Sequence, residues 1–97
     1  MILEIDFNSD EAIYVQLRNQ IIMGIACAEF ADGESLPSVR QLAQVLGVNM
    51  HTVNKAYAIL REEGYLKLDR RKGAVISVEI LEKQQELASI QENLRML

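Results

Sequence analysis

The sequence predicts a mostly α-helical domain with a small β-hairpin, followed by one further helix. Two short amphipathic patterns meet at Gly47, and residues 65–78 change to a strand-like pattern around a basic turn. A seven-residue apolar repeat then begins after Glu79. These three observations predict a winged helix-turn-helix over residues 1–78 and a C-terminal helical dimerisation segment over residues 79–97.

The first expected elements are a short arm and a long helix. Residues 1–7 alternate between apolar and polar side chains, which is typical of a strand or an extended arm. Ser9 or Asp10 is then expected to cap a helix that runs to about Glu29. The buried stripe of this helix has apolar residues at four-residue intervals, namely Ile13, Leu17, Ile21 and Ile25.

Residues 36–60 carry two short helices joined by a tight turn. Both repeat apolar residues at i, i+3, i+4 and i+7, first as Val39, Leu42, Ala43 and Leu46, then as Val53, Ala56, Tyr57 and Leu60. Gly47 supplies the left-handed backbone that ends the first helix at little cost. Ser38 and Gln41 predict a capping box at its start, and Asn49 is the expected N-cap of the second helix.

The start of the second short helix carries mostly polar side chains that point away from its apolar stripe. They lie where a recognition helix meets base edges, and they are Met50, His51, Thr52, Asn54 and Lys55. A single imidazole at such a polar helix start is more often a contact residue than a pH or metal sensor. This surface is therefore the expected reading surface for duplex DNA.

A hairpin with a basic tip is expected after Gly64. The pattern predicts strands near residues 65–68 and 74–78, and the turn between them includes Arg70, Arg71, Lys72 and Gly73. A hairpin directly after a recognition helix is a wing, and its basic tip suits the backbone or the minor groove of DNA. The alternative is a solvated turn whose charge has no function.

The distribution of charge supports this assignment although the net charge is −4. Residues 1–37 hold one basic and seven acidic residues, residues 38–75 hold seven and three, and residues 76–97 hold two and four. The positive charge therefore lies on the predicted DNA-binding segment. Its main carriers are Arg40, Lys55, Lys67, Arg70, Arg71 and Lys72.

Several classes of function are disfavoured. With Cys27 as the single cysteine and His51 as the single histidine, neither an internal disulfide nor a Cys/His zinc site can form. The longest apolar run, residues 21–28, is too short to span a bilayer, and no export signal precedes it. The pattern shows no nucleophile–base pair and no phosphate loop. We therefore expect a cytoplasmic protein that is not an enzyme and uses no cofactor or metal.

The segment after Glu79 predicts a helix with an apolar seam. Ile80, Leu87 and Leu94 share one heptad position, and Lys83, Ile90 and Leu97 fall three residues later. A seam this short is not stable alone, so it must pack either on the first helix of its own chain or on a second copy. We favour a dimer interface formed by Ile80, Leu87, Ile90, Leu94 and Leu97.

Segments throughout the chain resemble the GntR family of bacterial transcription regulators. The resemblance covers residues 11–78 and rests on AIYVQL at 12–17, LPSVRQLA at 36–43, LGVN at 46–49, TVNKAY at 52–57 and EGYL at 63–66. It implies DNA contacts from Ser38, Arg40, Asn49, His51, Thr52, Lys55 and the wing tip. The family pattern commonly has Asn in place of His51 and Gly-x-Gly-Thr in place of residues 71–74. Only about twenty residues follow the wing, as in the small YtrA-like subfamily, whose short C-terminal helices serve dimerisation.

The leading hypothesis is a sequence-specific transcription regulator, a repressor, that acts as a homodimer on a pseudo-palindromic operator. Its two recognition helices would meet half-sites about 34 Å apart. The alternative is a winged-helix protein-interaction module that binds an acidic protein through its basic face. A small-molecule effector could bind between the helical ends of two subunits, but no polar cluster in the sequence marks a pocket for it.

Overall fold

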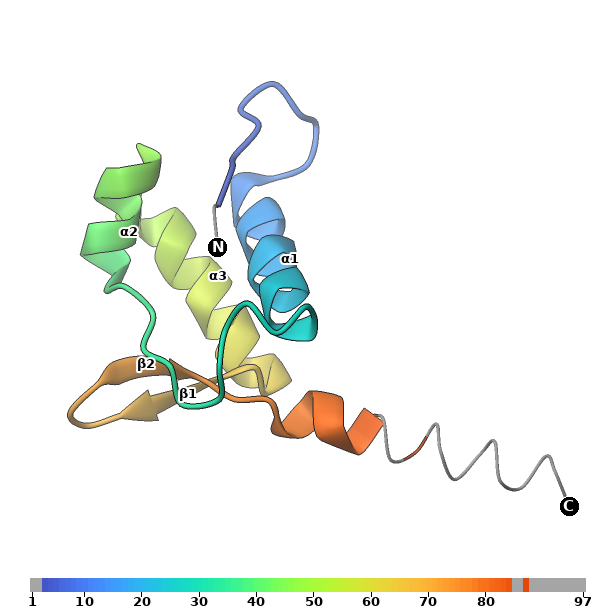
Figure 1. The fold of residues 1–97 in the computed structure, drawn as a ribbon. Coiled ribbons are helices and arrows are strands. Elements are labelled where there is room, and N and C mark those ends of the chain that lie inside the picture. The colour runs from blue at the N-terminus through green and yellow to red at the C-terminus, as the bar shows by residue number, and fades with distance from the viewer. Residues whose placement is uncertain (1–2, 85–86, 88–97) are drawn as a thin grey trace, which may run out of the picture.

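A computed structural model describes residues 3–84 and residue 87. In chain order the elements are α1 (Ile13–Ala26), α2 (Val39–Leu46), α3 (Met50–Glu63), β1 (Leu66–Asp69) and β2 (Gly73–Ile76). Residues 79–84 and residue 87 are also helical. The predicted seam residues Ile90, Leu94 and Leu97 lie outside the described residues. Figure 1 shows α1, α2 and α3 grouped together, with the hairpin at one end of α3 and the last helix beyond it.

The core lies between the three helices, because α1 and α2 both pack on α3. The expected apolar stripes are confirmed as the buried surfaces, and Leu17, Ile21, Val53 and Leu60 are fully inaccessible to solvent. The end members of two stripes, Ile13 on α1 and Val39 and Leu46 on α2, are only partly buried. Each helix therefore buries the face that its apolar spacing predicts.

The expected bounds of the first helix are wrong at both ends. The helix begins at Ile13, after Ala12, which makes no side-chain cap. Ser9 Oγ instead accepts a hydrogen bond from the backbone N–H of Glu11 at 3.1 Å, so the preceding residues form a turn. At the other end, Ala28 adopts a left-handed φ of 59°. The N–H of Glu29 then donates to the Gly24 carbonyl at 2.8 Å, which closes the helix in a Schellman arrangement.

Residues 3–6 form an extended arm rather than a strand. The side chain of Gln16 accepts from the backbone N–H of Asp6 at 2.9 Å and donates to the Asp6 carbonyl at 3.0 Å. One helical turn later, Gln20 makes the same pair of contacts with the backbone of Glu4. These two side-chain amides take the place of a neighbouring strand, and Leu3 and Ile5 can pack against the core.

The hairpin is antiparallel, as expected, and pairs Leu66 with Ile76 and Asp69 with Gly73. The linker before α2 also joins this sheet. The N–H of Gly33 donates to the Ile76 carbonyl at 2.8 Å, and the N–H of Leu36 donates to the Ala74 carbonyl at 2.9 Å. These backbone bonds fix the hairpin relative to the start of α2.

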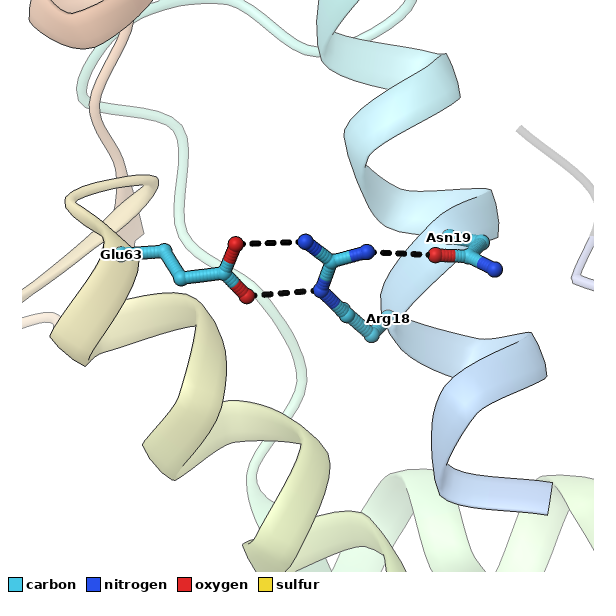
Figure 2. Close-up of polar contacts among 3 residues, drawn as sticks. All are labelled: Arg18, Asn19 and Glu63. Carbon is cyan, nitrogen blue, oxygen red and sulfur yellow. Dashed lines mark hydrogen bonds and ion pairs between the residues drawn. The ribbon is translucent and has the colours of Figure 1, made fainter. Parts of the chain in front are cut away.

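A bidentate ion pair joins α1 to the end of α3 (Figure 2). Arg18 donates from Nε to Glu63 Oε1 at 2.6 Å and from Nη2 to Oε2 at 2.5 Å. Its third nitrogen, Nη1, donates to Asn19 Oδ1 at 2.6 Å. The hydrogen bond from Arg18 lowers the pKa of Glu63, and the same bond raises the pKa of Arg18.

The first turns of the last helix lie beside the junction of α3 and β1. A Cβ atom placed on Gly64 would lie 3.8 Å from Cβ of Ile80, and Ile80 is partly buried. Lys67 of β1 pairs with Glu79 at 2.8 Å. Further along, the Leu87 side chain of the predicted seam is 58% exposed.

Candidate nucleic-acid interface

The start of α2 is fixed by the predicted capping box. Ser38 Oγ accepts from the N–H of Gln41, and Gln41 Oε1 accepts from the N–H of Ser38, both at 3.1 Å. Gly47 ends the helix with a left-handed φ of 71°, as its place in the turn predicts. Ser38 and Arg40 are both exposed, so the structure places them at a solvent-facing helix start.

Asn49 is the N-cap of α3, as expected. Its Oδ1 accepts from the N–H of His51 at 2.7 Å. The acceptor of this side chain is therefore committed to the cap, and its Nδ2 donors are the atoms available to a partner. A contact from Asn49 to DNA would accordingly be donated to an acceptor such as a phosphate oxygen.

The predicted reading surface faces solvent. Met50, His51, Asn54 and Lys55 are exposed and Thr52 is partly exposed. Two hollows border this surface, and Asn54 lines both. One, of about 310 Å³, lies between the start of α2, α3 and the hairpin and includes Ser38. The other includes Asn49, Met50 and His51. The structure thus brings Ser38 and the start of α3 to one face, whereas their contact with DNA stays a prediction.

A partly buried hydrogen bond holds the start of α2 in place next to α3. The Tyr57 hydroxyl donates to the Pro37 carbonyl at 2.8 Å, immediately before the capping box at Ser38. Burial raises the pKa of Tyr57 to about 12. Sequence reasoning treated Tyr57 only as an apolar stripe residue. No local pattern signals this bond, because its partner is a backbone carbonyl twenty residues away.

The wing tip is ordered by an acidic residue that the sequence analysis did not select. Asp69 Oδ1 accepts from the N–H of Arg71 at 2.8 Å and from the N–H of Lys72 at 3.0 Å. These two bonds lower the pKa of Asp69. The signal was present in the sequence, because Asp at the first position of a turn commonly accepts such bonds. The side chains of Arg70, Arg71 and Lys72 are all exposed around this turn, as is Gly73.

The positive surface is smaller than the sequence suggested. Lys67 pairs with Glu79, and the contact with this carboxylate raises the pKa of Lys67. Its charge is therefore largely offset within the protein. Lys55 is arranged differently, because its Nζ lies 4.0 Å from the centroid of the Tyr14 ring. Apart from Lys67, the exposed cations near the predicted surface are Arg40, Lys55, Arg61, Arg70, Arg71 and Lys72, and Arg61 lines the same hollow as Ser38 and Asn54.

Across residues 3–84 and 87, no three His, Cys, Asp or Glu side chains come together as a group that could hold a metal ion. The helices within these same residues are all too short or too polar to cross a membrane. Cys27, which follows α1, is exposed.

Three helices followed by a two-stranded hairpin, with a polar helix start and a basic hairpin tip on the surface, define a winged helix-turn-helix protein. A sequence model described as "Bacterial regulatory proteins, gntR family" matches residues 10–76. The chain belongs to the GntR family of bacterial regulatory proteins.

Known relatives and a solved structure agree with this assignment. Over 75 residues, 77% of this chain, it is 36% identical to the HTH-type transcriptional regulator Rv1152 of Mycobacterium tuberculosis and 37% identical to the HTH-type transcriptional repressor YtrA of Bacillus subtilis. These matches span 62% and 58% of the two relatives. The structure of YtrA from Sulfolobus acidocaldarius, a GntR-family transcription factor, is 38% identical with a TM-score of 0.77, covering 97% of this chain and 99% of that one. These relatives are transcription regulators, not enzymes.

Proposed function

We propose that this chain is a sequence-specific DNA-binding repressor that acts in the cytoplasm as a homodimer on a pseudo-palindromic operator. The observation that carries the proposal is the joint exposure of the polar start of α3 and the basic wing tip. Family membership supports it, and the relative named as a repressor supports the direction of regulation.

In this proposal the start of α3 enters the major groove. His51, Thr52 and Asn54 would meet base edges, because they are polar side chains that are exposed or partly exposed in the first two turns. Ser38 and Arg40 at the start of α2 would meet phosphates, since phosphate contacts set the register of such a helix on the duplex. The wing tip would contact the neighbouring backbone or minor groove.

The dimer part of the proposal is supported by the exposed Leu87 and by the heptad spacing of residues 80–97. A symmetric dimer would present two α3 helices to half-sites about 34 Å apart. Sedimentation velocity across the concentration range used for DNA binding tests this directly. A monomer at concentrations that saturate the operator would contradict the homodimer.

DNA binding is tested by gel retardation with the promoter region of the chain's own gene and with a random duplex of equal length. We expect tight retardation of the promoter fragment and weaker retardation of the random duplex. Changing both Arg71 and Lys72 to Ala should weaken binding to both duplexes and reduce the salt slope by about 0.9 for each phosphate that is no longer neutralised. His51→Ala should instead weaken retardation of the promoter fragment more than retardation of the random duplex.

Two outcomes would contradict this assignment. Equal losses on promoter and random DNA from His51→Ala would remove the base-reading role of that residue. Absence of retardation at low salt would reject DNA binding and favour the alternative, in which the basic face binds an acidic protein.

A further inference from the structure

Lys55 on α3 is held by an aromatic ring from a different helix. Its Nζ lies 4.0 Å from the ring centroid of Tyr14, which is in the first turn of α1. An ammonium group at this distance from a ring face is attracted to the negative face of the π system. The contact therefore restrains a long, exposed side chain on the side of α3 that faces α1.

The partner of Lys55 is an aromatic ring and not a carboxylate. Within the described part of the chain, the ion pairs join Arg18 to Glu63 and Lys67 to Glu79. A carboxylate offsets the charge of the cation that it holds, as Glu79 does for Lys67. A ring fixes the position of an ammonium and leaves its full positive charge, and Lys55 remains exposed. Lys55 is thus both restrained and still charged.

Lys55 and its sequence neighbour Asn54 point to different sides of α3. Asn54 lines two hollows on the side of α3 that faces α2, one of which also reaches the hairpin. Lys55 lies instead toward α1, at the edge of the predicted reading surface. A cation at the side of a helix in the major groove meets the phosphates that border the groove, whereas a base-reading side chain must point to the groove floor.

We propose that Tyr14 is a positioning residue that holds the Lys55 ammonium ready for a phosphate at the edge of the major groove. α1 thereby takes part in DNA binding although it lies outside the helix-turn-helix. This inference rests on the proposed function and goes beyond it, because it assigns Lys55 to sequence-independent backbone contact and gives Tyr14 a role in it.

The test compares Tyr14→Leu with the matched control Tyr14→Phe, each with Lys55 intact and in a Lys55→Met background. The Phe ring keeps the face that the ammonium contacts, so Tyr14→Phe should bind DNA as the unaltered protein does. Tyr14→Leu should weaken binding about two- to fivefold for each subunit bound, the range that one exposed cation–π contact supports. This weakening should be the same on random and promoter duplexes and should vanish in the Lys55→Met background.

A structural role for Tyr14 predicts different results. Tyr14→Leu would then weaken binding equally with Lys55 and with Met at position 55, and that outcome overturns the proposal. Unchanged binding by Tyr14→Leu with Lys55 intact also overturns it. A Lys55→Met variant that loses promoter specificity while keeping its salt slope also overturns the proposal. Loss of the phosphate contact should reduce the slope by about 0.9 for each subunit of the dimer.

A measurement without DNA separates this inference from the proposed function. The side-chain CH₂ protons next to Lys55 Nζ should show an upfield NMR shift from the Tyr14 ring, retained in Tyr14→Phe and absent in Tyr14→Leu. If the shift is present and no variant binds DNA, the proposed function has failed and the role in DNA binding falls with it. If DNA binds normally and the shift is absent, only the role of Tyr14 is rejected.

Discussion

Breaking the ion pair between Arg18 and Glu63 should measurably loosen α1 from α3. Both side chains are about one third exposed, at 31% and 33%, so water screens part of their attraction. Exposed pairs contribute about 0.2–1 kcal/mol, and two parallel charged hydrogen bonds favour the upper end of that range. We therefore expect a coupling free energy of about 1 kcal/mol between the two side chains. For a domain of this size that corresponds to a shift of roughly 4–8 °C in Tm.

The two single variants should differ in a defined direction. Glu63 is the last residue of α3, where the negative end of the helix dipole disfavours a carboxylate. Arg18→Met leaves that carboxylate without its partner, whereas Glu63→Gln removes the unfavourable charge. We therefore expect Arg18→Met to lower the free energy of unfolding by about 0.3–1 kcal/mol more than Glu63→Gln does.

The assay is urea denaturation of the unaltered chain, both single variants and the double variant, at neutral and acidic pH. The pKa of Glu63 is lowered in the folded protein, mainly by the hydrogen bond from Arg18. As the pH falls, the unfolded chain therefore takes up this proton first, near its ordinary pKa of about 4.3. The coupling should be complete above that pH and disappear as the pH falls through the lower pKa of the folded state. Coupling below about 0.2 kcal/mol at neutral pH, or coupling that persists in acid, would refute the reasoning.

Three further changes test local features of the fold. Gly47→Ala should destabilise by about 1–2 kcal/mol in thermal unfolding, because the new Cβ meets no atom within 4 Å and the cost is that of a left-handed alanine alone. Ala28→Gly should raise the free energy of unfolding by up to about 1 kcal/mol, because Ala28 has a left-handed φ of 59° that glycine adopts without strain. An unchanged or lower Tm would contradict this. Tyr57→Phe should lower the free energy of unfolding by about 1 kcal/mol at neutral pH, because it removes the hydrogen bond to Pro37. The pKa of Tyr57 is raised to about 12 in the folded chain, whereas an unfolded tyrosine ionises near pH 10. The unaltered chain should therefore lose its stability advantage over Tyr57→Phe as the pH rises from about 10 to about 12. Urea titrations at these two pH values would show the loss.

The features predicted correctly from the sequence are those that depend on neighbouring residues. The capping box of Ser38 and Gln41, the Asn49 cap and the Gly47 turn each involve residues a few positions apart, so composition and spacing determine them. The start of the first helix was predicted wrongly for the opposite reason. Ser9 and Asp10 are good caps by composition, but the amide of Gln16 holds the preceding turn and delays the helix to Ile13.

Contacts that position the candidate site were harder to predict. The exposed face of α3 followed from its apolar stripe, because burial of one face fixes the other. The contacts of Tyr57 with Pro37 and of Lys55 with Tyr14 join separate elements, and no periodicity in the chain reports them. Tertiary packing determines such pairs. From the sequence alone, Tyr57 and Lys55 can be placed on a helix, but their partners cannot be identified.

The segment before α2 links the three surfaces that the proposed function uses. On one side the N–H of Leu36 bonds to the Ala74 carbonyl of the hairpin, and on the other the Tyr57 hydroxyl of α3 bonds to the Pro37 carbonyl. The capping box of α2 follows at the next residue, Ser38. Because adjacent residues hold the hairpin and α3, a displacement of this segment would change the positions of the α2 start, the reading surface and the wing tip together. Specific binding needs all three in one register on the duplex, so this segment fixes their geometry without needing to touch DNA itself.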